Sequence, residues 1–379
     1  MNSLISLAQN ILMISGNSPP ISCGIGDYTA HLLPAIKEDN QQYSPIWLSR
    51  KERWFSFPFA SCQGVPLRRP WHKWERRGTA LACNYLKWKN PDLVHLQEEF
   101  YSYMEGDASL QLARGTRCPL IVTLHAYHLD PKIERQTKLI LDESDRIICS
   151  DRRTAGRLLD RTGRKADLVG WCSSPVYPQL LANEETSSSQ CFATFGFVHP
   201  DKMNFNVVRE ALGRVNGNNG TVEWKIIGPM DPKGNPHHVK LLQEFTDPWV
   251  EFTGRVNDLN DKRFHHRLAG MTAMLLPFRN KTGSNGTATS RSSLQIAWAF
   301  GLPVVASKPI DEEEDLRDGD NCILVDEDDP DAWRIALERI LNDQSLRETL
   351  RKGSLAAARQ FGWARLAKEH TRIYENLLN

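Results

Sequence analysis

Short apolar runs alternate with amphipathic segments along the whole chain. In the first half, runs rich in Ile, Leu and Val have the length of β-strands and cover residues 11–15, 93–97, 120–124 and 146–150. Helical patterns cover residues 28–36 and 132–141. Strands that are apolar throughout, with helices between them, are typical of parallel sheets covered on both faces.

The second half repeats this alternation, with strands expected at residues 191–197, 221–227, 250–252, 274–276, 304–306 and 322–325. Between the halves, residues 183–190 read NEETSSSQ, a polar segment typical of a linker. The fold class that we expect is α/β, with two Rossmann-like doubly wound parallel-sheet domains at residues 1–185 and 190–360. In such pairs, ligands bind in a central cleft at the carboxyl ends of the strands.

The segment 274–307 predicts an anion site. A strand is followed by a loop of Gly, Ser, Asn and Thr, and a helix begins near Arg291. The N–H groups and the positive dipole end of a helix start attract anions. Ser292 and Ser293 suit the capping position, and the Arg291 guanidinium can bind phosphate through two hydrogen bonds. A plain strand–helix crossover with a Gly-rich turn is the alternative.

Two glycines, Gly24 and Gly26, lie where a helix begins after the first strand. A glycine backbone allows a substrate or phosphate to approach closely. A nicotinamide-dinucleotide fingerprint would also place glycines here, but it needs a third glycine, where this chain has Thr29. It also needs an acidic residue at the end of the second strand, where the sequence reads Ser49-Arg50. We therefore favour substrate or phosphate binding.

Polar side chains follow other predicted strands. Gln97, Glu98 and Glu99 end one strand, and His125 directly follows the next. The topology directs both groups towards one cleft, although a lone histidine is more often structural. Lys202 follows the first strand of the second domain, where a cation would suit a diphosphate leaving group. A solvated surface charge is the alternative for this lysine.

Composition narrows the class of protein. The chain has 379 residues and a net charge of +1, which excludes a globally basic nucleic-acid binder. Its eight cysteines form no Cys-x-x-Cys pair and no zinc-like cluster with histidine, so we expect buried thiols in a reducing compartment. No apolar run has the length of a membrane span. We therefore expect a cytoplasmic protein.

Acidic runs at residues 311–315 and 326–329 resemble metal ligands only superficially. Acidic residues beside a helix start are more often caps and solvated charge. No metal site is therefore expected.

Residues 41–90 are basic and aromatic, with ten Lys or Arg against two Asp or Glu and with Trp54, Phe55, Trp71, Trp74 and Trp88. Such a segment suits the inner face of a membrane, an anionic lipid carrier or a phosphate-bearing acceptor, including nucleic acid. The alternative is a solvated face whose tryptophans line an acceptor pocket.

Four segments together carry a family resemblance: 195–202, 250–258, 273–307 and 361–378. Their order and spacing are similar to the GT4-type retaining glycosyltransferases, hexosyltransferase-like enzymes of glycan or glycoconjugate biosynthesis. The resemblance implies the GT-B fold, with a C-terminal helix at 361–379 returning to the first domain. It also implies an acceptor on the first domain, a nucleotide-sugar donor on the second, and no metal or other cofactor. The donor nucleotide, UDP, GDP or another, and the acceptor, a carbohydrate, lipid carrier or phosphate-bearing molecule, stay open.

The resemblance assigns a role to each matching position. Lys202 matches the cation at the diphosphate, His125 the histidine at the sugar, and Glu314 the acidic position before Asp318-Gly319. With Arg291, Lys202 and His125 form the expected catalytic set. The expected donor-binding set is Gly24, Gly26, Gly196, Arg255, Ser292, Ser293 and Glu314, and the expected acceptor-binding set is Gln97, Glu98 and Glu99.

The chain departs from the usual family pattern at two glutamate positions, which are Ala288 and Ile296 here. It resembles instead a branch in which a sequence like Ser290-Arg291-Ser292-Ser293 precedes the helix. The departure leaves two alternatives to a retaining glycosyltransferase. These are a non-catalytic GT-B protein that binds a nucleotide or a partner chain, and a nucleotide-sugar 2-epimerase.

Overall fold

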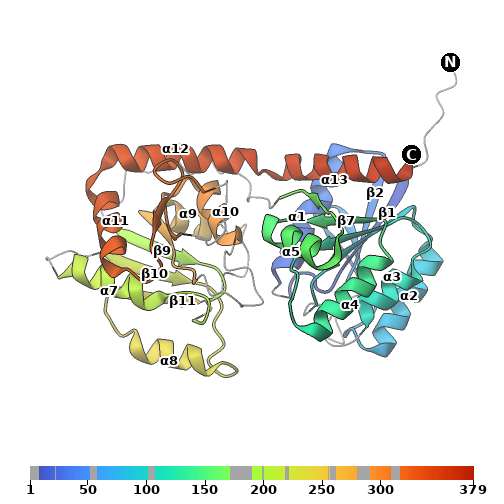
Figure 1. The fold of residues 1–379 in the computed structure, drawn as a ribbon, viewed down its shortest axis with the longest axis horizontal. Coiled ribbons are helices and arrows are strands. Elements are labelled where there is room, and N and C mark those ends of the chain that lie inside the picture. The colour runs from blue at the N-terminus through green and yellow to red at the C-terminus, as the bar shows by residue number, and fades with distance from the viewer. Residues whose placement is uncertain are drawn as a thin grey trace, which may run out of the picture. The chain divides into compact units, whose positions relative to one another are not determined.

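The computed structural model describes residues 8–21, 23–51, 58–100, 107–170, 190–198, 200–217, 222–254, 256, 262–279, 291–308 and 316–379. The chain divides into two compact units, Met1–Trp171 with Trp363–Asn379, and Cys172–Gly362. Each unit is described by itself below and can be followed in Figure 1.

Unit 1 contains an eight-stranded sheet with the order β3-β4-β2-β1-β5-β6-β7-β8. Its strands pair in parallel, except that β3 runs antiparallel to β4. The strands are β1 (Gln9–Ser15), β2 (Tyr43–Leu48), β3 (Phe59–Cys62), β4 (Val65–Arg68), β5 (Leu93–Glu98), β6 (Leu120–Leu124), β7 (Arg146–Cys149) and β8 (Asp167–Leu168). The helices are α1 (Gly24–Asp39), α2 (Arg76–Lys89), α3 (Ala108–Gly115), α4 (Pro131–Asp142), α5 (Arg152–Thr162) and α13 (Trp363–Leu378).

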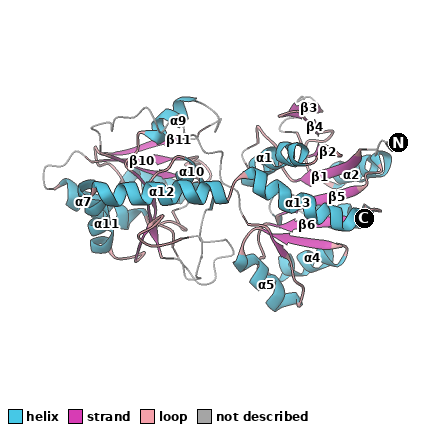
Figure 2. Cartoon of the chain, turned by 90° about the horizontal axis from the view of Figure 1, so that it is seen from above, coloured by secondary structure: helices cyan, strands magenta, loops and turns pink. Residues whose placement is uncertain are grey.

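The last helix of the chain, α13, packs against α1 in unit 1 (Figure 2). Its buried residues recur at spacings of three and four, which place them on one helix face: Leu366, Ala367, His370, Thr371, Ile373 and Tyr374. The Thr371 hydroxyl donates to a carboxylate oxygen of Asp39 at 2.6 Å, at the end of α1. Burial of this face therefore fixes α13 to unit 1.

Unit 2 contains a six-stranded parallel sheet with the order β11-β10-β9-β12-β13-β14. The strands are β9 (Cys191–Phe195), β10 (Glu223–Ile227), β11 (Val250–Gly254), β12 (Ala273–Leu276), β13 (Val304–Ser307) and β14 (Ile323–Val325). The helices are α7 (Phe205–Asn216), α8 (Pro236–Glu244), α9 (Lys262–Ala269), α10 (Arg291–Ala299), α11 (Pro330–Asn342) and α12 (Gln344–Gln360). Alternate residues of β9 and β12 belong to two different buried apolar clusters, so each face of this sheet is covered by its own cluster.

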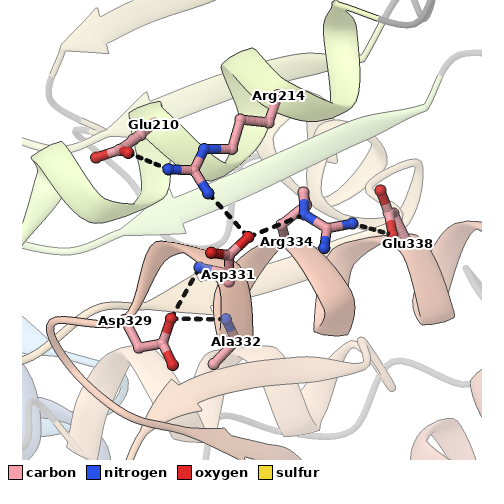
Figure 3. Close-up of polar contacts among 7 residues, drawn as sticks. All are labelled: Glu210, Arg214, Asp329, Asp331, Ala332, Arg334 and Glu338. Atoms are coloured by element: carbon pink, nitrogen blue, oxygen red, sulfur yellow. Dashed lines mark hydrogen bonds and ion pairs between the residues drawn. The ribbon is translucent and has the colours of Figure 1, made fainter.

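The second acidic run, at residues 326–329, ends in the N-cap residue of α11, Asp329. An Asp329 carboxylate oxygen accepts the backbone N–H groups of Asp331 at 2.9 Å and Ala332 at 3.1 Å, so Asp329 caps α11. Figure 3 shows this cap beside the ion pairs through which Arg214 of α7 joins Asp331 of α11. The Arg214 guanidinium, hydrogen-bonded to Asp331, lowers the pKa of this exposed carboxyl.

The predicted elements agree with the structure in both units, and the α/β class is confirmed. The predicted strand 191–197 is too long, because β9 ends at Phe195 and Gly196 adopts a φ of 124°. The predicted strand 146–150 is one residue too long, since β7 ends at Cys149. The β3–β4 hairpin was not predicted; Gln63 and Gly64, with φ of 48° and 79°, form its two-residue turn. Residues 183–189 of the expected linker lie outside the described residues.

Two expectations about side-chain burial need correction. Among the described cysteines, 149, 191 and 322 are buried, but 23, 62, 83 and 118 are only half-buried. Trp71 and Trp74 do not belong to a solvated face, because they are only 3% and 1% exposed. Their rings pack edge to face with centroids 4.7 Å apart in the core of unit 1. Within the described residues, no helix is long and apolar enough to cross a membrane.

Candidate functional site

Polar side chains gather at the carboxyl ends of β5 and β6 in unit 1. His125 directly follows β6, and its backbone N–H donates to the carbonyl of Glu98 at 3.0 Å, which extends the pairing of the two strands. The His125 side chain is 5% exposed, and its ring packs edge to face on Tyr28 of α1, with centroids 5.4 Å apart. The fold therefore brings His125 next to the first turns of α1.

A buried chain of hydrogen bonds leads from His125 into the sheet. The amide oxygen of Gln97 lies 2.8 Å from His125 Nε2, and the amide nitrogen lies 3.2 Å from His95 Nε2. An amide oxygen only accepts and an amide NH₂ only donates. His125 therefore carries its proton on Nε2, and His95 Nε2 is an acceptor.

The tautomer of His95 follows from the same reasoning. Its Nε2 also lies 2.7 Å from the Thr123 hydroxyl, which must donate to it. The ring proton is then on Nδ1, which donates to the Tyr374 hydroxyl at 2.7 Å. Tyr374 belongs to α13, so the last helix of the chain completes the polar network that begins at His125. We call His125, Gln97, His95, Thr123 and Tyr374 the histidine network.

Burial keeps the histidines of this network neutral. It lowers the pKa of His125 to about 4 and that of His95 well below the usual value of 6.5. His370 of α13 lies beside His95, with ring centroids 5.6 Å apart, and burial lowers its pKa to about 4 as well. A neutral His125 with its proton committed to Gln97 cannot serve as a general acid through Nε2 near pH 7. Its Nδ1 can only accept hydrogen bonds in this tautomer.

The three expected acceptor-binding residues have different environments. Gln97 is 0% exposed, and its amide contacts two members of the histidine network, His125 and His95, and the sulfur of Met13. Glu98 is 2% exposed, bonds to Ser109 of α3, and has a pKa raised to about 8 by burial. Contact with an acceptor therefore does not fit Gln97 or Glu98. Glu99, with a side chain 19% exposed, lies 3.3 Å from His128 Nε2 and is the accessible member of the set.

Gly24 and Gly26 occupy the start of α1. Gly24 is exposed, whereas a Cβ on Gly26 would lie 3.0 Å from the carbonyl oxygen of Asn17, so the loop after β1 passes close to the helix. Trp74 Nε1 donates to the carbonyl of Gly16 at 2.6 Å, which anchors this loop on the core. No side-chain cap hydrogen bond is present at Cys23, the N-cap residue. The helix start is therefore held in place by the loop.

In unit 2, the loops after β9 and β12 leave the same edge of the sheet, because the two strands are parallel neighbours. The Ser293 hydroxyl of α10 donates to the carbonyl of Phe195 at 2.5 Å, which joins the first turn of α10 to the end of β9. A Cβ on Gly228 would lie only 1.7 Å from the Gly196 carbonyl oxygen, so glycine is required at position 228. Gly196 and Ser293 are therefore brought together.

The Lys202 loop is braced through its backbone. The Lys202 carbonyl accepts from the N–H of Arg279 at 2.7 Å, and the Asn204 N–H donates to the carbonyl of Pro277 at 2.7 Å. Buried His238 accepts from the N–H of Asp231 through Nδ1 at 2.8 Å and donates through Nε2 to the carbonyl of Val198 at 2.8 Å. The Lys202 side chain itself is exposed. A backbone held by hydrogen bonds thus presents an exposed cation at the carboxyl edge of the sheet.

The remaining predicted residues are described in part or not at all. The backbone of Arg291 and Ser292 forms the start of α10, but their side chains lie outside the described residues, as do Arg255, Glu314 and Ala288. Ile296, at the second missing glutamate position, is 6% exposed and belongs to an apolar cluster. Sequence reasoning also missed His95, Tyr374 and His238. Of these three, only His95 had a signal in the sequence, because it is a polar residue inside the apolar run 93–97.

Comparisons with known proteins support the resemblance found in the sequence. Residues 190–343 match the family model described as Glycosyl transferases group 1, and this match lies entirely within unit 2. A D-inositol 3-phosphate glycosyltransferase of Nocardioides is 37% identical over 78 residues, which are 21% of this chain and 17% of that protein. The chain thus matches about a sixth of that relative's length.

Solved structures match the whole chain. Sucrose-phosphate synthase from Thermosynechococcus elongatus superposes with a TM-score of 0.73 at 17% identity, over 97% of this chain and 99% of that one. HepE from Anabaena, solved in complex with UDP and glucose, superposes with a TM-score of 0.70 at 14% identity, over 97% and 100%. The resemblance to glycosyltransferases is confirmed, and the chain has the GT-B fold.

Two buried histidines of unit 1, His125 in the histidine network and His370 beside it, predict how stability depends on pH. Unfolded histidines bind protons below about pH 6.5, whereas folded His125 and His370 do so only near pH 4. Lowering the pH from 6.5 to 4 should therefore reduce the free energy of unfolding, by at most about 3 kcal/mol per histidine. Glu98 acts in the opposite direction, because its raised pKa stabilises the fold below pH 4.5 and this contribution is lost by about pH 8. Denaturant unfolding at a series of pH values should show a shallower rise in His370→Gln and a steeper rise in Glu98→Gln.

The tautomer assignment predicts the effect of a charge at Gln97. In Gln97→Glu, a carboxylate would accept from His125 Nε2 and favour the protonated ring, so the pKa of His125 should rise by at least about one unit. An NMR titration of the His125 ring measures this shift. Gln111→Glu, which makes the same charge change at an exposed site on α3, is the control. An unchanged His125 titration in Gln97→Glu would contradict the network.

Proposed function

We propose that the chain is a retaining, metal-independent glycosyltransferase that moves a sugar from a nucleotide-diphosphate sugar to an acceptor hydroxyl. The observation that carries the proposal is the carboxyl edge of unit 2, where the Gly196 loop, Lys202 and the start of α10 come from neighbouring strands. The family match over the same unit supports it. The complex of HepE with UDP and glucose supports a nucleotide-sugar donor, with UDP as the first candidate.

The chemistry that we assign to unit 2 is stabilisation of the leaving group. The bond from the sugar's anomeric carbon to the diphosphate oxygen breaks, and the acceptor oxygen bonds to that carbon on the same face. The acceptor's proton passes to the departing phosphate oxygen. Lys202, Arg291 and the N–H groups at the start of α10 would stabilise the charge that develops on the diphosphate. Ser293 positions that helix start through its bond to Phe195.

The role that we assign to His125 is hydrogen bonding to the sugar. Because burial lowers its pKa to about 4, the ring is neutral at pH 7, and Nδ1, which is buried in this structure, would accept from a hydroxyl once the sugar reaches it. The histidine network fixes the ring orientation that this bond requires. In unit 1, Glu99 is the accessible candidate for acceptor binding, and exposed Gly24 allows a ligand to approach the start of α1, whereas Gly26 is buried against the loop after β1.

The three aspartates after β14 support a reaction without metal, because their carboxylates have partners within unit 2. An Asp328 oxygen lies 2.7 Å from Asn204 Nδ2 and 3.8 Å from an Arg279 nitrogen. Asp326 accepts from the backbone N–H of Asp328 at 3.1 Å, and Asp329 caps α11. The diphosphate charge would then be balanced by Lys202 and Arg291.

A non-catalytic GT-B protein that binds a nucleotide is the second candidate. Ile296 favours it, because an apolar side chain packed in the core cannot replace the carboxylate of the usual family pattern. The two candidates differ in turnover: a binding protein would hold a nucleotide sugar without hydrolysing or transferring it.

A donor and acceptor assay in EDTA tests the proposed function. Thermal shift with UDP-, GDP-, ADP-, CMP- and dTDP-sugars selects the donor, because ligand binding to the folded state raises Tm. We expect hydrolysis or transfer of that donor in EDTA, and NMR of the product should show the donor's anomeric configuration. Binding without turnover on any acceptor supports the second candidate. A 2-epimer formed without acceptor supports an epimerase, and activity restored only by Mn²⁺ or Mg²⁺ contradicts the metal-independent mechanism.

Removal of the Lys202 cation should reduce turnover. Lys202→Ala should lower kcat by at least about a hundredfold, because the leaving diphosphate loses a preorganised charge partner in the transition state. Tm should hardly change, since the side chain is exposed. Lys233→Ala, at another exposed lysine of unit 2, is the control and should keep its activity. Full activity in Lys202→Ala would refute the assigned role.

A further inference from the structure

The outer face of α2 exposes two large apolar side chains, Leu81 and Trp88. Arg77, Leu81, Asn84 and Trp88 are exposed and recur at spacings of three and four along the helix, so they share one face. Trp88 is 77% exposed and Leu81 is 46% exposed. Tyr85 is half-buried beside Trp88, with ring centroids 5.6 Å apart. Trp88, Tyr85 and Leu81 thus place apolar surface together on one helix, and contiguous exposed apolar surface is typical of an interaction site.

The same helix is strongly cationic. Its sequence RRGTALACNYLKWK contains Arg76, Arg77, Lys87 and Lys89 and no acidic residue. Arg76 and Arg77 lie in the first turn, where the positive end of the helix dipole disfavours cations. Helix stability therefore gives no reason for these two arginines.

Contacts extend the surface from α2 to the edge of the sheet. The Arg68 guanidinium lies 5.3 Å from the ring centroid of Phe59 on β3, and Arg68 also bonds to Tyr85. Phe59 is 69% exposed. Arg69, the next cation, is instead held inside unit 1, where it donates to the carbonyl of Pro19 at 3.1 Å. The continuous surface, here named the α2 patch, comprises Phe59, Arg68, Arg76, Arg77, Leu81, Tyr85, Lys87, Trp88 and Lys89.

We propose that the α2 patch docks unit 1 on an anionic lipid surface. An amphipathic helix with Trp and Leu between Lys and Arg lies in the membrane plane, with its apolar side chains among the acyl chains. Its cations then contact lipid phosphates, and tryptophan is favoured at this depth because its ring is amphipathic. A single-stranded nucleic acid would also contact cations and aromatics, but it would not require the exposed aliphatic side chain of Leu81.

This docking does not depend on the proposed glycosyl transfer, so purified protein and lipid vesicles test it directly. Co-sedimentation compares vesicles of phosphatidylcholine alone with vesicles that also contain phosphatidylglycerol. We expect binding to the anionic vesicles, weakened by salt because exposed charge contacts are screened. Changing Arg76, Arg77, Lys87 and Lys89 to Gln should lower the partition coefficient by at least about tenfold, since each cation near an anionic surface contributes about a fivefold factor. Trp88→Ala should lower it several-fold with all charges retained.

Matched variants distinguish the α2 patch from effects of net charge or of any exposed apolar side chain. Changing Lys352, Arg359, Lys368 and Arg372 to Gln removes the same charge from exposed positions on α12 and α13 and should leave binding unchanged. Leu81→Ser should also lower the partition coefficient, whereas Ile335→Ser, which makes the same change at a side chain 49% exposed on α11, should leave it unchanged. Circular dichroism verifies that each variant is folded. The proposal is wrong if the wild-type protein does not bind anionic vesicles, or if the two four-fold Gln variants bind them equally well. It is also wrong if the four-fold Gln variant of α2 loses affinity only for a single-stranded RNA probe.

Discussion

The hydrogen-bonding requirements of two polar side chains buried in β5, His95 and Gln97, determine how the candidate site of unit 1 is built. His95 and Gln97 lie inside a parallel strand, and unpaired polar groups there would cost several kcal/mol. His95 has partners on two other elements, Thr123 on β6 and Tyr374 on α13, and the Gln97 amide contacts His125 and His95. Because every donor in this series must meet an acceptor, the orientation of the Gln97 amide and the tautomers of both imidazoles are fixed together. The tautomer of His125 is thus determined through Gln97 by residues beyond it in the histidine network, Thr123 and Tyr374.

In unit 2, the candidate site is held in place mainly by hydrogen bonds of backbone groups. Its loops are braced by carbonyl and N–H groups, by Ser293 and by His238, and Gly228 makes room for the Gly196 carbonyl. Exposed Lys202 is carried by that frame. Backbone dipoles held in place, together with one exposed cation, suit a ligand whose charge is delocalised over several oxygens.

The sequence predicted most strands because parallel strands are apolar throughout, and it predicted α10 because loop and helix composition differ sharply there. It did not predict the β3–β4 hairpin, whose turn uses Gln63 where an Asn or Asp would have been recognisable. The site was predicted only in outline. His125 could be placed from its position after an apolar run, but its partner Tyr374 lies 279 residues from His95 and no local pattern links them. Burial then gave Gln97 and Glu98 environments that differ from the accessible positions expected of them.

The return of α13 to unit 1 also has a consequence for synthesis on the ribosome. Domains usually fold in order as the chain emerges, the N-terminal domain first. Unit 1 cannot follow this order to completion, because Tyr374 and His370 are translated only after all of unit 2. Until then, the polar face of β5 lacks its α13 partners, and the nascent first unit must wait in an incomplete state. Unit 2, whose segments are contiguous in the chain, is the one that can finish folding first.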